Sequence, residues 1–316
     1  MSQLPRLTDS EILAARGAKN PLSLSEPYAS YVEPERTAEG LVEQVATLLL
    51  TNRECPFRCA MCDLWRNTLD DPTPAGAVPD QVRHALSQLP PTRHVKLYNS
   101  GNFFDAKAIP VADRPRIASL VENHATVIVE NHPKFCGVAC REFAEQLHGK
   151  LEVAIGLETA HAETLQWLNK RMTLDDYRKA VERLREWDIA VRSFVLLRPP
   201  GMSNQAGVEW STRSVEFALE CGARCVAIVP VRGGNGIMER LRDGGYFEPP
   251  SLSACEDAFD QALGVTDVDS QRVFIDLWDL ERFSACDHCF DARRDRLHRM
   301  NLSQQVEARI ACRCAR

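Results

Sequence analysis

The stretch VATLLLTNRECPFRCAMC, residues 45–62, joins the most apolar run of the chain to three closely spaced thiols. Cys55, Cys59 and Cys62 have the spacing C-x3-C-x2-C, and a loop at a strand end can direct all three toward one centre. A closed structural metal site uses four protein ligands, whereas a catalytic metal keeps a position open. Soft thiolates favour iron–sulfur, zinc or copper(I). The pattern predicts an open metal site; the alternatives are a zinc knuckle with a distant fourth ligand, or buried free cysteines.

The composition is that of an ordinary soluble globular protein, with 44% hydrophobic and 26% charged residues among 316. No apolar run approaches the length of a membrane span, and the first residues lack the apolar core of a signal peptide. We therefore expect a cytoplasmic protein, in which twelve cysteines suit metal ligation better than disulfides. The net charge of −6 argues against broad nucleic-acid binding, although residues 291–299 carry four arginines and a histidine.

From residue 41 onward, short apolar runs alternate with amphipathic helical patterns, which predicts β-α-β units and a parallel sheet. Six such units favour a partial parallel (β/α)6 TIM-like barrel, and no G-x-G-x-x-G follows the first strand to suggest a dinucleotide fold. We expect a seventh, edge-like strand near residues 273–277. The predicted strands are 45–51, 94–98, 126–130, 151–157, 191–197 and 225–230.

The chain divides in this prediction into three parts. Residues 1–40 form an N-terminal extension with a short helix near 9–18, and residues 41–265 form the partial barrel. Residues 266–316 form a C-terminal extension that carries a cysteine-rich metal-binding tail.

Polar residues at the strand ends are the candidate ligand-binding groups, because chemistry in parallel barrels gathers at the carboxyl ends of strands. Gly101 and Asn102 follow the second strand, and Glu130 and Glu158 end the third and fourth. Arg192 lies inside the fifth strand. A buried charge without a partner is costly, so each charged side chain has either a ligand or an internal salt bridge.

The tail holds a second group of thiols. Cys286 and Cys289 form a C-x2-C pair, and Cys312 and Cys314 form a C-x-C pair. Four thiolates fit a closed structural zinc site or an auxiliary [4Fe-4S] cluster. Zinc is favoured because paired short knuckles suit a tetrahedral ion, with His288 and His298 as possible substitute ligands. Unligated tail cysteines are the remaining alternative. The other cysteines are interpreted as small buried residues: Cys136, Cys140, Cys221, Cys225 and Cys255.

The cysteine spacing of residues 55–62 resembles the signature of the radical SAM superfamily. Together with residues 97–105, 152–159 and 168–173 and the tail motifs, the chain resembles the family of the archaeosine synthase radical SAM subunit. It is more distantly similar to the elongator catalytic-subunit type of core.

This resemblance implies a [4Fe-4S] cluster held by Cys55, Cys59 and Cys62, with S-adenosylmethionine bound at the fourth iron. It implies reductive cleavage to a 5′-deoxyadenosyl radical that abstracts hydrogen from the substrate, with electrons from a donor such as flavodoxin or ferredoxin. Where the superfamily has a Gly-Gly-Glu-like turn, this chain has Ser100-Gly101-Asn102, without the acid.

The cofactor-binding residues in this reading are Gly101, Asn102, Glu130, Glu158 and Arg192. The family acts on a modified nucleoside of tRNA. Two alternatives are a radical SAM enzyme on a small-molecule or natural-product substrate with an auxiliary cluster, and a non-enzymatic zinc-binding module. No membrane partner is expected.

Overall fold

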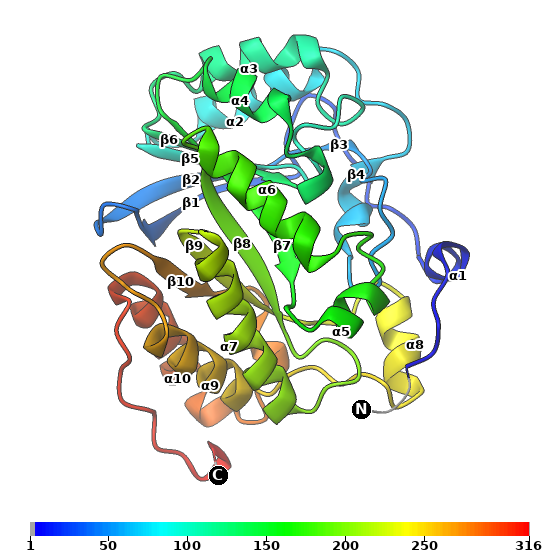
Figure 1. Cartoon of the computed structure of the whole chain (residues 1–316), viewed down its shortest axis with the longest axis vertical. Coiled ribbons are helices and arrows are strands. Elements are labelled where there is room, and N and C mark those ends of the chain that lie inside the picture. Colours follow the sequence, from blue (N-terminus) through cyan, green and yellow to red (C-terminus); the bar gives the residue numbers. More distant parts are fainter. Residues whose placement is uncertain (1–3, 316) are drawn as a thin grey trace.

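The computed structural model describes residues 4–315. Its centre is an eight-stranded sheet in the order β1-β2-β5-β6-β7-β8-β9-β10, which curls into a half-barrel (Figure 1). All neighbouring pairs from β2 to β10 are parallel, and β1 pairs antiparallel with β2. The prediction of a partial parallel barrel is confirmed. The strands are β1 (Ala29–Arg36), β2 (Val42–Leu49), β5 (His94–Tyr98), β6 (Thr126–Asn131), β7 (Lys150–Glu158), β8 (Ala190–Leu197), β9 (Cys225–Pro230) and β10 (Arg272–Ile275), with a small separate pair β3 (Asn52–Arg53) and β4 (Thr68–Leu69).

Helices connect successive parallel strands and cover the outer face of the sheet (Figure 1). Apolar side chains of strands and helices meet there in one large buried core. The α-helices are α1 (Asp9–Ala14), α2 (Ala77–Gln88), α3 (Arg114–Leu120), α4 (Val138–Ala144), α5 (Ala162–Trp167), α6 (Leu174–Glu186), α7 (Asn204–Cys221), α8 (Ile237–Asp243), α9 (Leu252–Gly264) and α10 (Asp287–Ser303). The 3-10 turns are η1 (Leu64–Asn67), η2 (Val111–Asp113), η3 (Pro133–Phe135), η4 (Leu280–Phe283) and η5 (Arg313–Ala315).

Local sequence signals account for several element ends. Thr173 and Asp176 form the predicted capping box at the start of α6, each side chain bonded to the other residue's backbone N–H. Gly222 ends α7 with a φ of 108°, a left-handed conformation in which glycine carries no steric penalty.

Strand β1 was not predicted, although it pairs with β2 over its full length, from Ala29 opposite Leu49 to Arg36 opposite Val42. Its sequence, ASYVEPER, is half charged or proline-bearing, and all its residues are half-buried. An edge strand tolerates Pro34 because one side of its backbone needs no ladder partner. The segment 29–36 therefore extends the sheet without showing an apolar pattern.

A smaller apolar cluster joins the N-terminal segment to the loops at the carboxyl end of the barrel. Ile12 of α1 packs there with Met238 and Leu241 of α8 and with Ala60 of the cysteine loop. This cluster fixes α1 and α8 beside residues 55–62.

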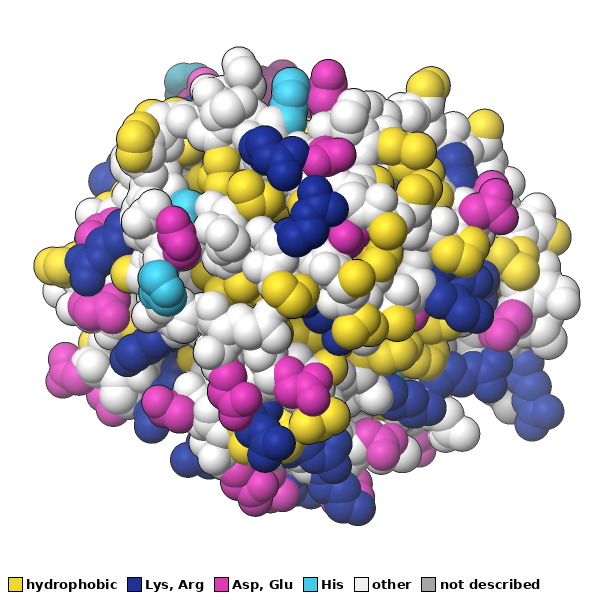
Figure 2. Space-filling model, turned by 90° about the horizontal axis from the view of Figure 1, so that it is seen from above, with side chains coloured by type: hydrophobic (Ala, Val, Ile, Leu, Met, Phe, Trp, Pro, Cys, Tyr) yellow, Lys and Arg dark blue, Asp and Glu magenta, His cyan; other side chains and the backbone are white. Residues whose placement is uncertain are grey.

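The surface carries charges of both signs. Figure 2 shows acidic and basic side chains interspersed with hydrophobic ones over one face. The stretch 291–299, which the sequence suggested as a local basic patch, lies in α10 with Arg293 and Arg296 buried in ion pairs with Glu256 and Asp260. Within residues 4–315, no helix is long and apolar enough to cross a membrane.

The amino-terminal end of the half-barrel, opposite the cysteine loop, contains a network of buried charged side chains. Arg192 donates to Glu35 and Glu152, at 2.6 Å each, and Lys96 lies 2.6 Å from Glu35. Arg272 pairs with the second oxygen of Glu152 at 3.1 Å. A cavity of about 480 Å³ opens beside this network. Burial alone would raise the pKa of Glu35, but the Arg192 and Lys96 cations hold it well below its usual value.

Replacing Arg192 with leucine should destabilise the fold by about 3 kcal/mol or more, because two buried carboxylates lose their shared cation. The matched control is Arg213→Leu, which removes an exposed pair with Glu209 and should cost less than about 0.5 kcal/mol. Urea unfolding of both variants measures the difference. Equal losses in the two variants would show that the buried network contributes nothing special.

Candidate active site

The three clustered cysteines lie on a loop at the carboxyl end of the sheet, directly after β2 and the short β3. Cys55, Cys59 and Cys62 are half-buried and free. Within the loop itself, a turn bond from the Cys62 N–H to the Cys59 carbonyl, 3.2 Å, draws the last two cysteines together. The loop has no sheet or helix ladder, so its conformation depends on contacts from other segments.

Asn235, in the loop after β9, is the first of these contacts. Its side-chain amide donates to the carbonyls of Ala60, at 2.7 Å, and Cys62, at 3.2 Å. Its oxygen accepts the Met238 N–H at 2.9 Å. Asn235 is 3% exposed, so both loop carbonyls are satisfied away from water. The glycine-rich loop after the sixth predicted strand thus supports the cysteine loop through one asparagine.

The α5–α6 connection supplies a second clamp. The Ala60 N–H donates to the Leu168 carbonyl at 2.9 Å, and the Asn169 amide donates to the Arg58 carbonyl at 2.7 Å. Asn169 has a φ of 58°, a left-handed conformation that asparagine tolerates better than most residues. The strained backbone conformation therefore occurs at Asn169, which positions the cysteine loop.

A histidine at the end of β6 forms a third contact. The ring of Phe57 stacks on His132, with centroids 4.0 Å apart and planes at 26°. His132 Nε2 donates to the Lys170 carbonyl at 2.9 Å, and Nδ1 accepts the Lys134 N–H at 3.1 Å. Burial lowers the pKa of His132 to about 3, with the Lys170 charge adding to the shift. His132 is therefore neutral, with its proton on Nε2.

Asn102 links the turn after β5 to the cysteines. Its amide nitrogen lies 3.2 Å from Cys55 Sγ, and its oxygen accepts the His132 N–H at 2.8 Å. The Gly101 N–H donates to Glu130 Oε1 at 3.3 Å, and the Asn99 N–H donates to the same oxygen at 2.5 Å. Burial raises the pKa of Glu130 to about 7, and these backbone donors oppose the shift. The turn after β5, which contains no acidic residue of its own, is therefore held by the Glu130 carboxylate of β6.

Glu158 and Lys170 form a buried ion pair beside the cysteines. The register of β7 and β8 shifts between Gly156 and Glu158, and Glu158 has a φ of 68°. A Cβ at position 156 would collide with both members of the pair, so this glycine leaves room for it. Lys170 lies within residues 168–173, which carry part of the family resemblance, but the sequence does not identify it as a site residue, because nothing in its spacing shows that it is buried.

The Lys170 charge also faces the thiols. Burial raises the pKa of Cys59 to about 12, and the Lys170 ammonium opposes that rise. The same ammonium acts on Cys55. A metal binds the thiolate form, so its binding here releases protons.

The structure thus gathers Gly101, Asn102, Glu130 and Glu158 with the cysteine loop at one end of the barrel. Arg192 is not among them: it lies near the start of β8, where two carboxylates of the chain occupy its guanidinium. The four tail cysteines form a separate group, with all sulfurs within 4.8 Å of one another.

No protein-family model matches the sequence. Archaeosine synthase subunit beta of Thermococcus kodakarensis is 28% identical over 186 residues, which cover 56% of this chain and 57% of that protein. Archaeosine synthase subunit beta of Methanosarcina acetivorans is 24% identical over 247 residues, covering 73% of this chain and 70% of that protein. Elp3 of Methanocaldococcus infernus is a structural neighbour with a TM-score of 0.53 and 15% identity, covering 70% of this chain and 59% of that chain.

At 15% identity, the structural likeness bears on the fold alone, and the fold agrees with the half-barrel described above. The archaeosine synthase resemblance inferred from the sequence motifs agrees with the names of these two relatives. Both relatives are named as subunits of a synthase.

Replacing Asn235 with alanine should destabilise the protein by about 2 kcal/mol, because two buried carbonyls of the cysteine loop lose their donor. Iron bound after reconstitution should also be lost faster to a chelator. Asn20→Ala is the matched control: it removes an exposed amide that bonds only to the Asn67 side chain, and should change stability by less than about 0.5 kcal/mol. Urea unfolding and iron release measure the two effects. Unchanged iron release in the Asn235 variant would contradict the clamp.

Proposed function

We propose that this chain is a radical SAM enzyme whose [4Fe-4S] cluster is held by Cys55, Cys59 and Cys62. The observation that carries the proposal is three half-buried free thiols on one loop at the carboxyl end of a parallel half-barrel. Three thiolates leave one position open, as a catalytic centre requires. A structural zinc ion held by these three cysteines would need a fourth protein ligand. Within residues 4–315 they are not part of a tight four-ligand group.

When bound, the cluster would supply the reductive cleavage of S-adenosylmethionine to methionine and a 5′-deoxyadenosyl radical. The electron would come from a flavodoxin- or ferredoxin-type donor. The residues of this chain orient the reactants. Asn102 holds Cys55 through its amide and fixes the turn that contains Gly101. Asn235 and Asn169 fix the carbonyls between the cysteines.

Glu130 and Glu158 complete the proposed cofactor pocket. Glu130 anchors the backbone N–H groups of residues 99 and 101, which turns that loop toward the cysteines. Glu158 keeps Lys170 beside the thiols, where an ammonium favours negative charge. Arg192 is omitted from the pocket, because its anion partners are Glu35 and Glu152. Residues 41–265 form the catalytic core in this proposal.

The substrate in this proposal is a modified nucleoside of tRNA. The support is the name of the relatives, archaeosine synthase subunit beta. The cation pattern beside the cysteine loop also suits an anionic partner. Arg16, Lys19 and Arg58 surround Glu54, at 2.7, 2.9 and 3.1 Å, and Lys19 also pairs with Asp70 at 2.7 Å, so three cations face two carboxylates. The tail cysteines hold a second metal, either zinc or a cluster.

Cys59→Ala should abolish 5′-deoxyadenosine formation, because two cysteines cannot hold the cluster. The protein is reconstituted anaerobically with iron and sulfide, reduced, and given S-adenosylmethionine, and the nucleoside product is measured by chromatography. Cys221→Ala, outside both cysteine groups and buried on α7, is the matched control and should retain activity. Wild-type levels of 5′-deoxyadenosine from Cys59→Ala would exclude the proposed centre.

Deletion of the gene should remove one modified nucleoside from digested tRNA and accumulate its unmodified precursor. Mass spectrometry of tRNA nucleosides and of free metabolites from the two strains is the measurement. Restoring the wild-type gene should restore the nucleoside, and restoring the Cys59→Ala gene should not. A change confined to free metabolites would instead assign a small-molecule substrate.

A further inference from the structure

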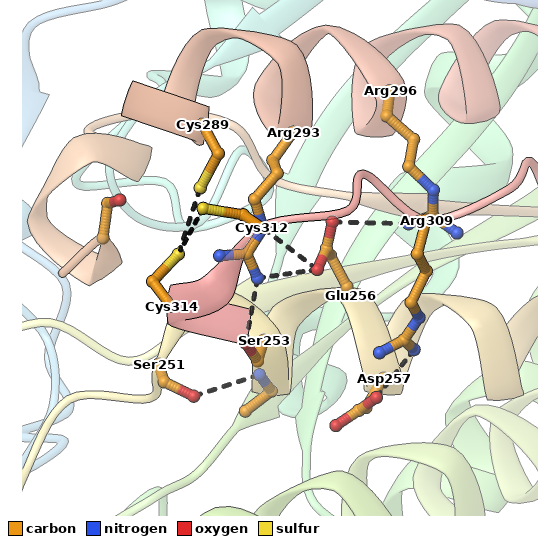
Figure 3. A network of polar contacts seen from close by, with 12 residues as sticks. Ser251, Ser253, Glu256, Asp257, Cys289, Arg293, Arg296, Arg309, Cys312 and Cys314 are labelled. Carbon is orange, nitrogen blue, oxygen red and sulfur yellow. Dashed lines mark hydrogen bonds and ion pairs between the residues drawn. The ribbon is translucent and has the colours of Figure 1, made fainter. Parts of the chain in front are cut away.

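The C-terminal cysteines gather from two segments that are distant in sequence. Cys286 immediately precedes α10 and Cys289 lies in its first turn, whereas Cys312 and Cys314 lie in the tail. Cys286 Sγ lies 4.0 Å from Cys312 Sγ, and Cys314 Sγ lies 3.3 Å from the sulfurs of Cys289 and Cys312. Figure 3 shows the side chains of Cys289, Cys312 and Cys314 directed toward one another. All four cysteines are free thiols.

The spacing of the four sulfurs distinguishes one ion from a cluster. With zinc–sulfur bonds of about 2.3 Å, tetrahedral geometry places neighbouring sulfurs about 3.8 Å apart. The four tail sulfurs all lie within 4.8 Å of one another. A [4Fe-4S] cluster binds each thiolate to a different iron, which holds the four sulfurs further apart than a single ion does.

The cysteine trio of the active-site loop provides a contrast in the same molecule. Within residues 4–315, no other group of three or more metal-ligand side chains is drawn together within 4.8 Å, the trio of Cys55, Cys59 and Cys62 included. The two groups therefore differ in spacing as well as in number. The wider group suits a cluster and the tighter group suits a single ion.

We propose that Cys286, Cys289, Cys312 and Cys314 bind one zinc ion, which fastens the C-terminal segment to α9 and α10. Four protein thiolates leave no open position, so the ion has a structural role. This proposal does not rest on the radical SAM chemistry, because it uses none of the residues of the cysteine loop.

The segment between the two cysteine pairs already lies on these helices. Arg296, fully buried in α10, donates to the carbonyls of Glu307 and Ala308 and to Asp260 of α9. Arg309 of the tail pairs with Asp257 at 2.6 Å (Figure 3) and with Asp260 at 2.7 Å. The pairs made by Arg309 are partly exposed and individually weak. A zinc ion bound by Cys312 and Cys314, just beyond Arg309, would hold the C-terminal end of the segment in place.

A buried cation stands next to the sulfurs. Arg293 of α10 pairs with Glu256 at 2.7 Å and donates to Ser253 at 2.9 Å. Figure 3 shows it beside the cysteine group. Four thiolates around a divalent ion carry a net charge of about −2, and a neighbouring guanidinium compensates part of it.

The decisive measurement is the metal content of the full-length protein, determined by mass spectrometry of the elements. Protein expressed with zinc and without iron reconstitution should carry one zinc ion per chain, and Cys312→Ser should carry none. Cys221→Ser is the matched control and should keep the ion. After reconstitution, Cys312→Ser should bind as much iron as the wild type, whereas Cys59→Ala should lose iron and keep zinc.

X-ray absorption at the zinc edge of the wild-type protein keeps the proposal testable if Cys312→Ser does not fold. Four sulfur neighbours at about 2.3 Å are expected. Loss of iron rather than zinc from Cys312→Ser, or a zinc edge with nitrogen and oxygen neighbours, would overturn the proposal. Failure of 5′-deoxyadenosine formation with zinc still at the tail would reject the proposed function alone.

Chelation tests the fastening itself. Removing zinc should release the segment 305–315, so that trypsin cleaves after Arg309 in the apo protein and not in the zinc-bound protein. Cleavage within other exposed loops should be unchanged by the chelator. Identical cleavage after Arg309 with and without zinc would show that the ion does not hold the tail.

Discussion

The cysteine loop, residues 55–62, has almost no backbone ladder of its own, and its shape is imposed by side chains from other parts of the barrel. Asn102, Asn169 and Asn235 each bring one amide to the loop, from the turn after β5, the α5–α6 connection and the loop after β9. Ordering a loop costs conformational entropy at every residue, and these bonds offset that cost only together. The three donors meet because the parallel sheet curls. The geometry of the thiols therefore depends on the curvature of the whole barrel.

The two ends of the barrel treat buried charge differently. At the amino end, Arg192 is saturated by Glu35 and Glu152, so the network is internally neutralised and structural. At the carboxyl end, Lys170 has one carboxylate partner, Glu158, and its remaining field falls on the thiols. Both cations are buried, but the sequence marks only Arg192 as needing an anion. Only the position along a parallel strand, early for Arg192 and beyond the end for Lys170, separates a structural cation from one beside the site.

The parallel units could be predicted because their strands are buried on both faces and appear as continuous apolar runs. The bounds of β5 and β9 match the predicted ranges 94–98 and 225–230 for this reason. Strand β1 and helix α10 escaped prediction because ion pairs replace apolar contacts in them. Arg296 of α10 is fully buried. Because this residue is charged, the buried face of the helix does not appear as an apolar stripe in the sequence. Apart from Arg192, the candidate site residues were predicted where a polar residue or glycine follows or ends a buried strand. Lys170 was not predicted, because only tertiary packing buries it.

Each of the two cysteine groups has a buried cation beside it that is paired with a carboxylate. Thiolates are costly to bury, and a neighbouring cation reduces that cost. Lys170 beside the trio is fixed by Glu158, and Arg293 beside the tail group is fixed by Glu256. Burial alone would lower the pKa of Arg293, but Glu256 and Cys289 raise it, so the guanidinium stays charged. In each case a buried carboxylate holds the cation in place before any metal binds. The carboxylates would thus act on the proposed metal centres without touching them, and each cysteine group has beside it a cation that no cysteine motif contains.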